Sequence, residues 1–276
     1  DVNGAASIYR IPVKTGSALK YSTLSKNPTF AAFNNREATI EDYVTPYKVY
    51  YTKAYGMRRN SEAKDDVAGS LVGTDAYIKA SEGGFNQEAW DKLGIKTGHS
   101  GVCGDYLEFT LNKPITPFYA RYYLGGSLFA PVPADFIKAL GGGSDEAAFT
   151  AGTKLWGKFN NTATLSPVDT FLSTGPYVLE EWAKDSKITY KRNPNYVSQT
   201  GNWEIEAATK RPSSYHIQGV YIDIITALKE DNEAALKKFL NNELHSCSVP
   251  STRIEEFAND PRTTIVPGSS TTKLNL

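Results

Sequence analysis

The chain has 276 residues, and its 30 Lys and Arg residues balance 30 Asp and Glu residues to give a formal net charge of zero. A neutral chain has no general attraction for nucleic acid or anionic lipid, so we expect neither as a partner. No stretch approaches the roughly 18 apolar residues of a membrane span, and two cysteines do not make a disulfide framework. The length suffices for one or two domains.

Two strand-like runs open the chain, at residues 7–13 and 18–23. The polar residues Lys14-Thr15-Gly16-Ser17 between them are typical of a turn. The pattern therefore predicts a β-hairpin in which the two runs pair with each other.

A helix is expected at about residues 39–55, because tyrosines recur every four residues and would share one face: Tyr43, Tyr47 and Tyr51. Pro46 complicates this helix, since proline donates no backbone hydrogen bond. Either the helix begins after Thr39 and bends at Pro46, or Thr45 is the cap and Pro46 is the first helical residue.

The middle of the chain predicts short helices and one half-buried strand. In the strand, apolar residues alternate with polar ones: Leu107, Phe109 and Leu111. Lys113-Pro114 should end it, because proline interrupts a ladder of hydrogen bonds. Helices are expected at residues 74–80, 117–124, 134–140 and 146–159, with a glycine-rich joint at residues 141–144.

A second hairpin is predicted at residues 174–197. Its first arm, residues 177–182, follows a Gly-Pro pair, and its second arm, residues 187–192, alternates polar and apolar side chains. Asn193-Pro194-Asn195 should end the pairing, because proline lacks a backbone donor and restricts the residue before it.

The last third of the chain predicts a loop, a strand, a helix and the start of another strand. Residues 198–214 are polar and without period, whereas Val220, Ile222 and Ile224 alternate as in a strand. A helix over residues 229–244 would share one apolar face among Leu236, Phe239 and Leu240. Residues 271–276 are typical of the start of a strand.

The second hairpin, with the letters TGPYVLEEW and ITYKRNPNYV, resembles the signature region of the oligopeptide-binding proteins of ABC importers, family 5 of the extracellular solute-binding proteins. The stretches NNREATIEDYV, LEFTLNKPITPF and FAPVP are also similar to the family pattern, which favours a helix start at Thr39. The chain departs from that pattern at Asn35, where a glycine is usual, at residues 242–245, which lack the family's glycine and aspartate, and by an insertion at residues 98–104.

The resemblance implies a mixed α/β fold, namely a periplasmic-binding-protein-like type II lobe with an inserted α+β subdomain. Residues 1–143 would form the inserted subdomain with adjoining strands of the first lobe. Residues 144–276 would form part of the first ligand-binding lobe, and the opposing lobe would be absent from this fragment.

The resemblance also implies the function: non-catalytic capture of a solute, expected to be a peptide, for an ABC importer. The implied partners are a peptide and the permease subunits, without nucleic acid and without a cofactor. The implied location is the extracellular face of the bacterial cytoplasmic membrane or the periplasm, with membrane contact only through a lipid anchor not present in this chain. By analogy with the family, Ser270, Thr272 and Asn275 are the expected ligand contacts.

Two alternatives stay open at this point. One is a surface receptor for peptides or pheromones, or an interaction protein, on the same scaffold. The other is a penicillin-recognising acyl enzyme, since Ser17 to Lys20 fit S-x-x-K and Lys96-Thr97-Gly98 fit K-T-G. The third sequence box of such enzymes is missing, and Ser17 precedes a strand-like run instead of opening a helix.

Two pairs of residues have the side chains that zinc prefers: His99 with Cys103, and His245 with Cys247. Their spacings differ from those of common zinc motifs, and the two pairs fall in different predicted subdomains. We therefore expect no metal site and two unlinked thiols.

Overall fold

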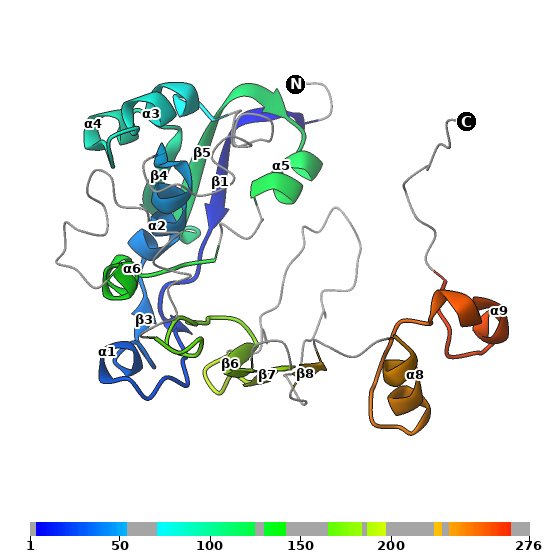
Figure 1. Ribbon diagram of the computed structural model, residues 1–276. Helices are drawn as coiled ribbons and strands as arrows, with labels where there is room; N and C mark the ends of the chain where they lie inside the picture. Colours follow the sequence, from blue (N-terminus) through cyan, green and yellow to red (C-terminus); the bar gives the residue numbers. More distant parts are fainter. Residues whose placement is uncertain are drawn as a thin grey trace. The chain divides into compact units, whose positions relative to one another are not determined.

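A computed structural model describes residues 4–53, 71–124, 130–141, 165–183, 187–196, 224–227 and 232–265. The chain forms two compact units, Asp1–Trp182 with Thr189–Ile225, and Ala183–Ile188 with Thr226–Leu276. Helices and strands are mixed throughout the first unit, which confirms the predicted α/β class (Figure 1).

The first unit is built around an antiparallel sheet with the strand order β1-β5-β4. Its strands are β1 (Ala6–Pro12), β4 (Ile95–Ser100) and the long central β5 (Gly104–Ile115). The predicted face of β5 is confirmed, because Leu107, Phe109 and Leu111 are buried. The strand passes through Pro114 to Ile115, one residue beyond its predicted end.

The predicted hairpin of residues 7–23 is wrong. β1 pairs with β5, whereas β2 (Gly16–Lys20) pairs with β3 (Glu37–Ala38). The backbone N–H of Val13 donates to the Asp105 carbonyl at 2.9 Å. The chain is therefore still bonded to β5 at the position where the predicted hairpin would turn. Alternating polarity predicts that a segment is a strand, but it does not predict which strand pairs with it. Strand β5 is longer than β2 and has a buried face, and β1 pairs with β5.

Helix α2 (Ile40–Tyr51) lies against this sheet and begins where the family pattern favoured, after Thr39. The Asp42 carboxylate accepts a hydrogen bond from the Thr39 backbone N–H at 2.9 Å and so caps the first turn. Pro46 lies inside the helix, which ends at Tyr51 and not near residue 55. The predicted tyrosine face is buried, and the Tyr47 ring lies 5.7 Å from that of Phe109.

Short helices contribute side chains to two clusters of buried residues. The predicted helices at residues 74–80 and 117–124 are confirmed as α3 (Thr74–Ala80) and α5 (Pro117–Leu124), and α4 (Gln87–Trp90) follows α3. A second core lies between α1 (Pro28–Ala31) and α6 (Ala134–Gly141), where Phe136 meets Phe30 and Phe33 edge to face at 5.7 and 5.2 Å.

The predicted hairpin at residues 174–197 is confirmed. β6 (Tyr177–Ala183) and β7 (Lys187–Arg192) pair, and β8 (Ile224–Ala227) completes a three-stranded sheet in the order β6-β7-β8. The insertion expected at residues 98–104 forms the end of β4 and the turn into β5.

The second unit contains α8 (Asn232–Leu240), the 3₁₀ turn η6 (Ser251–Arg253) and α9 (Ile254–Phe257). Helix α8 is shorter than predicted, because Asn242 adopts a φ of 62° and ends it. The Glu243 N–H reaches back to the Lys238 carbonyl at 2.8 Å, as in a glycine-type helix end. Among the described residues, no helix has the length and apolarity to cross a membrane.

Several predicted elements lie outside the described residues. They are most of the joint at residues 141–144, the helix at 146–159, the loop at 198–214, the strand positions Val220 and Ile222, and the strand start at 271–276.

Candidate functional site

The predicted ligand contacts Ser270, Thr272 and Asn275 lie outside the described residues, so they stay a prediction. Among the described residues, the features that bear on function are clusters of polar side chains in the first unit and one hollow in each unit.

Asn193, at the end of the signature hairpin, is buried and binds three segments of the chain. Its Oδ1 accepts hydrogen bonds from the Ser22 hydroxyl at 2.5 Å and from the Asn195 backbone N–H at 2.8 Å. Its Nδ2 donates to the Gly175 carbonyl at 2.7 Å, just before the first arm of the hairpin. The sequence indicated only that pairing ends here, and the structure shows that one amide side chain closes the hairpin on itself and on an early segment.

The early segment is held by backbone bonds as well. Ser22 and Ser173 exchange two hydrogen bonds, at 2.8 and 3.0 Å. The Asn195 side chain donates to the Tyr21 carbonyl at 3.2 Å. The family signature therefore ends in residues that join parts of the chain 171 positions apart, which is a structural role.

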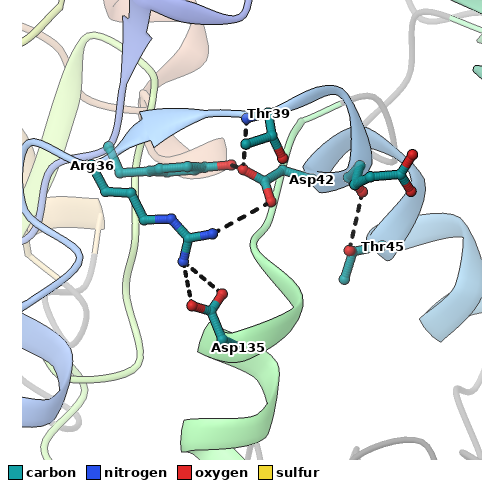
Figure 2. Close-up of polar contacts among 7 residues, drawn as sticks. Arg36, Thr39, Asp42, Thr45 and Asp135 are labelled. Carbon is teal, nitrogen blue, oxygen red and sulfur yellow. Dashed lines mark hydrogen bonds and ion pairs between the residues drawn. The ribbon is translucent and has the colours of Figure 1, made fainter. Parts of the chain in front are cut away.

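A second polar junction surrounds Asp42, a carboxylate that is 3% exposed (Figure 2). The Tyr21 hydroxyl donates to it at 3.1 Å, and Arg36 lies 3.9 Å away. Arg36 also donates to the Asp135 carboxylate of α6 at 2.6 Å. Burial, together with the Asp42 charge, raises the pKa of the Tyr21 hydroxyl far above its usual value. The junction joins the residues after β2 and before β3 to α2 and α6, and its ionisable groups are hydrogen-bonded or ion-paired within the chain.

Pro46 creates a third link at the same helix. Because proline has no N–H, the Asp42 carbonyl lacks its helical partner. The Val132 N–H donates to that carbonyl at 2.8 Å. The segment before α6, whose letters FAPVP are similar to the family pattern, is thus bonded to α2 at the carbonyl that Pro46 leaves without a helical partner.

The acyl-enzyme hypothesis is wrong on geometry. Ser17 and Lys20 both lie in strand β2, so Ser17 does not open a helix as the motif requires. The Lys20 amine is therefore not placed beside the Ser17 hydroxyl as the S-x-x-K motif of a helix would place it.

The two His and Cys pairs lie in different units of the chain. The His99 Nδ1 lies 2.8 Å from the Asp105 carboxylate, and the thiols of Cys103 and Cys247 are free. Within the described ranges no group of three or more His, Cys, Asp or Glu side chains could hold a metal ion.

The second unit has a hollow of about 770 Å³ with a largely apolar wall that includes Leu236, Phe239 and Phe257. Arg262 lies 5.4 Å from the centre of the Phe239 ring. Hydrogen bonds from Arg262 hold the pKa of the Asp260 carboxyl at about 2, so this pair stays charged at neutral pH. The lining of this hollow therefore combines apolar side chains with the ion pair of Asp260 and Arg262.

The fold and the signature hairpin point to one class of protein. The family model of the bacterial extracellular solute-binding proteins, family 5 Middle, matches residues 34–276. The chain therefore belongs to this family.

Particular relatives are found among oligopeptide-binding proteins. The chain is 26% identical over 156 residues to oligopeptide-binding protein AliA of Streptococcus pneumoniae, which is 56% of this chain and 18% of that protein. It is 27% identical over 158 residues to AliB of the same species, 57% of this chain and 19% of AliB. The chain thus spans less than a fifth of these relatives.

Solved structures share the fold. An oligopeptide-binding protein of Borrelia burgdorferi, OppAIV, aligns with a TM-score of 0.58 at 18% identity over 95% of this chain and 39% of its own. Haemophilus influenzae OppA, solved in complex with the peptide RPPGFSPFR, aligns with a TM-score of 0.56 at 13% identity, over 92% of this chain and 37% of that one. At these identities the likeness is one of fold.

Proposed function

We propose that this chain is one part of a two-lobed binding protein that captures peptides for an ABC importer, without a catalytic step. The observation that carries the proposal is the family match over residues 34–276, together with the Asn193 closure that gives the family signature a physical role. The relatives are named oligopeptide-binding proteins, and one solved neighbour holds a nine-residue peptide, RPPGFSPFR.

In this proposal the binding protein works at the extracellular face of the bacterial cytoplasmic membrane or in the periplasm. A peptide held between two lobes favours the closed arrangement, because it contacts both lobes only when they meet. The closed form then docks on the permease subunits. Residues 1–143 are proposed as the inserted subdomain with adjoining strands, and residues 144–276 as part of the first lobe.

The proposed ligand contacts are Ser270, Thr272 and Asn275, whose hydroxyl and amide groups suit the backbone of an extended peptide. Their test uses the complete protein with the peptide that copurifies with it. That peptide should raise the Tm of the complete protein by mass action.

Replacing the three residues by alanine together should reduce this rise in Tm, with little change in the Tm of the unliganded protein. The matched control is Ser251→Ala with Asn241→Ala, two exposed polar positions of the same unit, which should leave the rise unchanged. A full rise in the triple variant would contradict the assignment of these contacts but not the peptide-binding function.

A further inference from the structure

A groove of about 290 Å³ lies in the first unit, where α2, α4 and β4 meet. Figure 1 shows α2 and α4 near this strand. The lining comes from three elements: Glu41, Val44 and Lys48 of α2, Gln87, Trp90 and Asp91 of α4 and its end, and Ile95, Lys96 and Thr97 of β4. Val44 and Trp90 are buried and form an apolar floor, whereas most of the remaining side chains are polar.

Strand β4 is an edge strand of the described sheet, since the order is β1-β5-β4. The Thr110 N–H donates to the Gly94 carbonyl at 2.8 Å, which fixes the phase of the antiparallel ladder. Lys96 and Gly98 therefore bond to Glu108 and Tyr106 of β5.

The backbone N–H and C=O groups of the alternate residues, Ile95 and Thr97, then point away from β5 at the edge of the sheet. Within the described residues these groups have no backbone partner. An extended peptide is the ligand whose own backbone matches such an edge.

Two opposite charges stand along the groove on the same side of α2. The Glu41 side chain is exposed and the Lys48 side chain is partly exposed, and among the described residues neither forms an ion pair. The Lys48 ammonium lies 5.4 Å from the centre of the Phe85 ring and 5.6 Å from that of Trp90, which position it without neutralising it. Seven residues of helix separate the two positions by roughly 10 Å along the helix axis.

The other charged groups of the groove are engaged within the chain. Lys96 donates to the Asp91 carbonyl at 3.1 Å, and Gln87 donates to the Asp91 carboxylate at 2.6 Å. In the part of the chain that the structure describes, the Glu41 carboxylate and the Lys48 ammonium are therefore the charged groups of the groove that form neither an ion pair nor a hydrogen bond, and they lie beside a row of backbone groups.

We propose that this groove binds a short zwitterionic peptide of about three residues as an added strand on β4. Three extended residues span roughly 10 Å, the separation of Glu41 and Lys48 along α2. The peptide's amino terminus meets Glu41, its carboxylate meets Lys48, and its middle side chain lies on Val44 and Trp90. This site is separate from the contacts proposed above at Ser270, Thr272 and Asn275, and it does not depend on them.

The test is a titration of the 276-residue chain with trialanine, followed by amide NMR shifts. We expect saturable shifts at Ile95, Lys96 and Thr97. Acetylating the amino terminus of trialanine, or amidating its carboxylate, should each weaken binding about twofold to fivefold, the range for one partly exposed charge pair.

Two variants assign the ends. Glu41→Gln should bind trialanine and acetylated trialanine equally, and Lys48→Gln should bind trialanine and its amide equally. A variant that is merely less stable would bind all the peptides more weakly but would keep its preference among them, so equal binding reports the loss of one charge contact. The control Glu88→Gln with Lys92→Gln, which removes an exposed ion pair of the α4 region, should leave both preferences intact. Shifts confined to other residues, or equal binding of all three peptides by the unaltered chain, would overturn the proposal.

Discussion

Two asparagines take the place of glycine where the backbone is left-handed. The family pattern has a glycine at the position of Asn35 and another in the turn after α8, and the chain has φ values of 65° at Asn35 and 62° at Asn242. Asparagine tolerates this conformation better than other residues with a Cβ atom. Both residues that depart from the family pattern thus adopt the left-handed conformation that glycine also favours.

At this scale we predict that Asn35→Ala and Asn242→Ala each lower the free energy of unfolding by about 1 kcal/mol, because alanine is strained at positive φ. Asn35→Gly and Asn242→Gly should stay within about 0.5 kcal/mol of the original chain. Urea denaturation of the chain measures both. Asn241→Ala, beside Asn242 but without positive φ, is the control, and an equal loss there would show that the left-handed backbone is not the cause.

Asp169 gives the chain a pH dependence that can be tested at one residue. Burial alone would raise the pKa of this carboxyl, but hydrogen bonds from Ser25 and Ser166 outweigh burial and hold the pKa below its usual value. A carboxyl with a lowered pKa in the folded state stabilises it fully above about pH 4, and this contribution is lost as the pH falls through the folded-state pKa.

We therefore expect Asp169→Asn to cost about 1–2 kcal/mol at pH 7, since the amide cannot accept all the same hydrogen bonds. The difference from the original chain should shrink as the pH falls below about 4, roughly the pKa of a free aspartate. Urea denaturation at pH 7 and at lower pH measures it, with the exposed Asp75→Asn as control. A difference that stays constant with pH would contradict the assigned shift.

At the scale of elements, local patterns predicted the pieces better than their partners. The signature hairpin, α3, α5 and the buried face of β5 follow from periodicity and from turn residues that lie close together in the sequence. The pairing of β1 with β5 does not, because it joins Tyr9 to Phe109 and no local signal selects so distant a partner. The same reason explains the junctions: RNPNY marked the end of the hairpin, but not that Asn193 binds Ser22.

Strand β4 was missed for a different reason. Its residues Ile95 to Ser100 include Gly98 and polar side chains, and only Ile95 is buried, so the apolar alternation that marks a strand is absent. The strand forms because β5 supplies a partner across a short turn. The groove beside β4 could not be predicted for that reason.

The bond from Val132 to the Asp42 carbonyl makes a prediction about α2 and the segment before α6. Val132→Pro removes the N–H donor and should cost about 1–3 kcal/mol, because the Asp42 carbonyl then lacks a partner. In a Pro46→Ala background the cost should fall by about 1 kcal/mol, since the alanine that replaces Pro46 has a backbone N–H that can bond the same carbonyl.

Denaturation of the two single variants and the double variant measures this coupling. Changes in the packing of the Val132 side chain occur in both backgrounds and cancel. Val132→Ala, which keeps the N–H, should show no coupling to Pro46→Ala. Equal costs of Val132→Pro in both backgrounds would contradict the role given to Pro46.

At the scale of the molecule, several polar side chains of the described residues join segments that are distant in the sequence, among them Asn193, Asp42 and Arg36. The family match supplies the class, and the proposed capture of a peptide rests on a second lobe acting with this chain. The proposal therefore belongs to the complete protein.

The most direct test is mass spectrometry of the ligand that copurifies with the complete protein under native conditions. We predict one peptide, or a family of peptides, in a ratio near one per protein and released on denaturation. A sugar or a metal complex in the same ratio would contradict peptide capture while leaving the fold and the family unchanged.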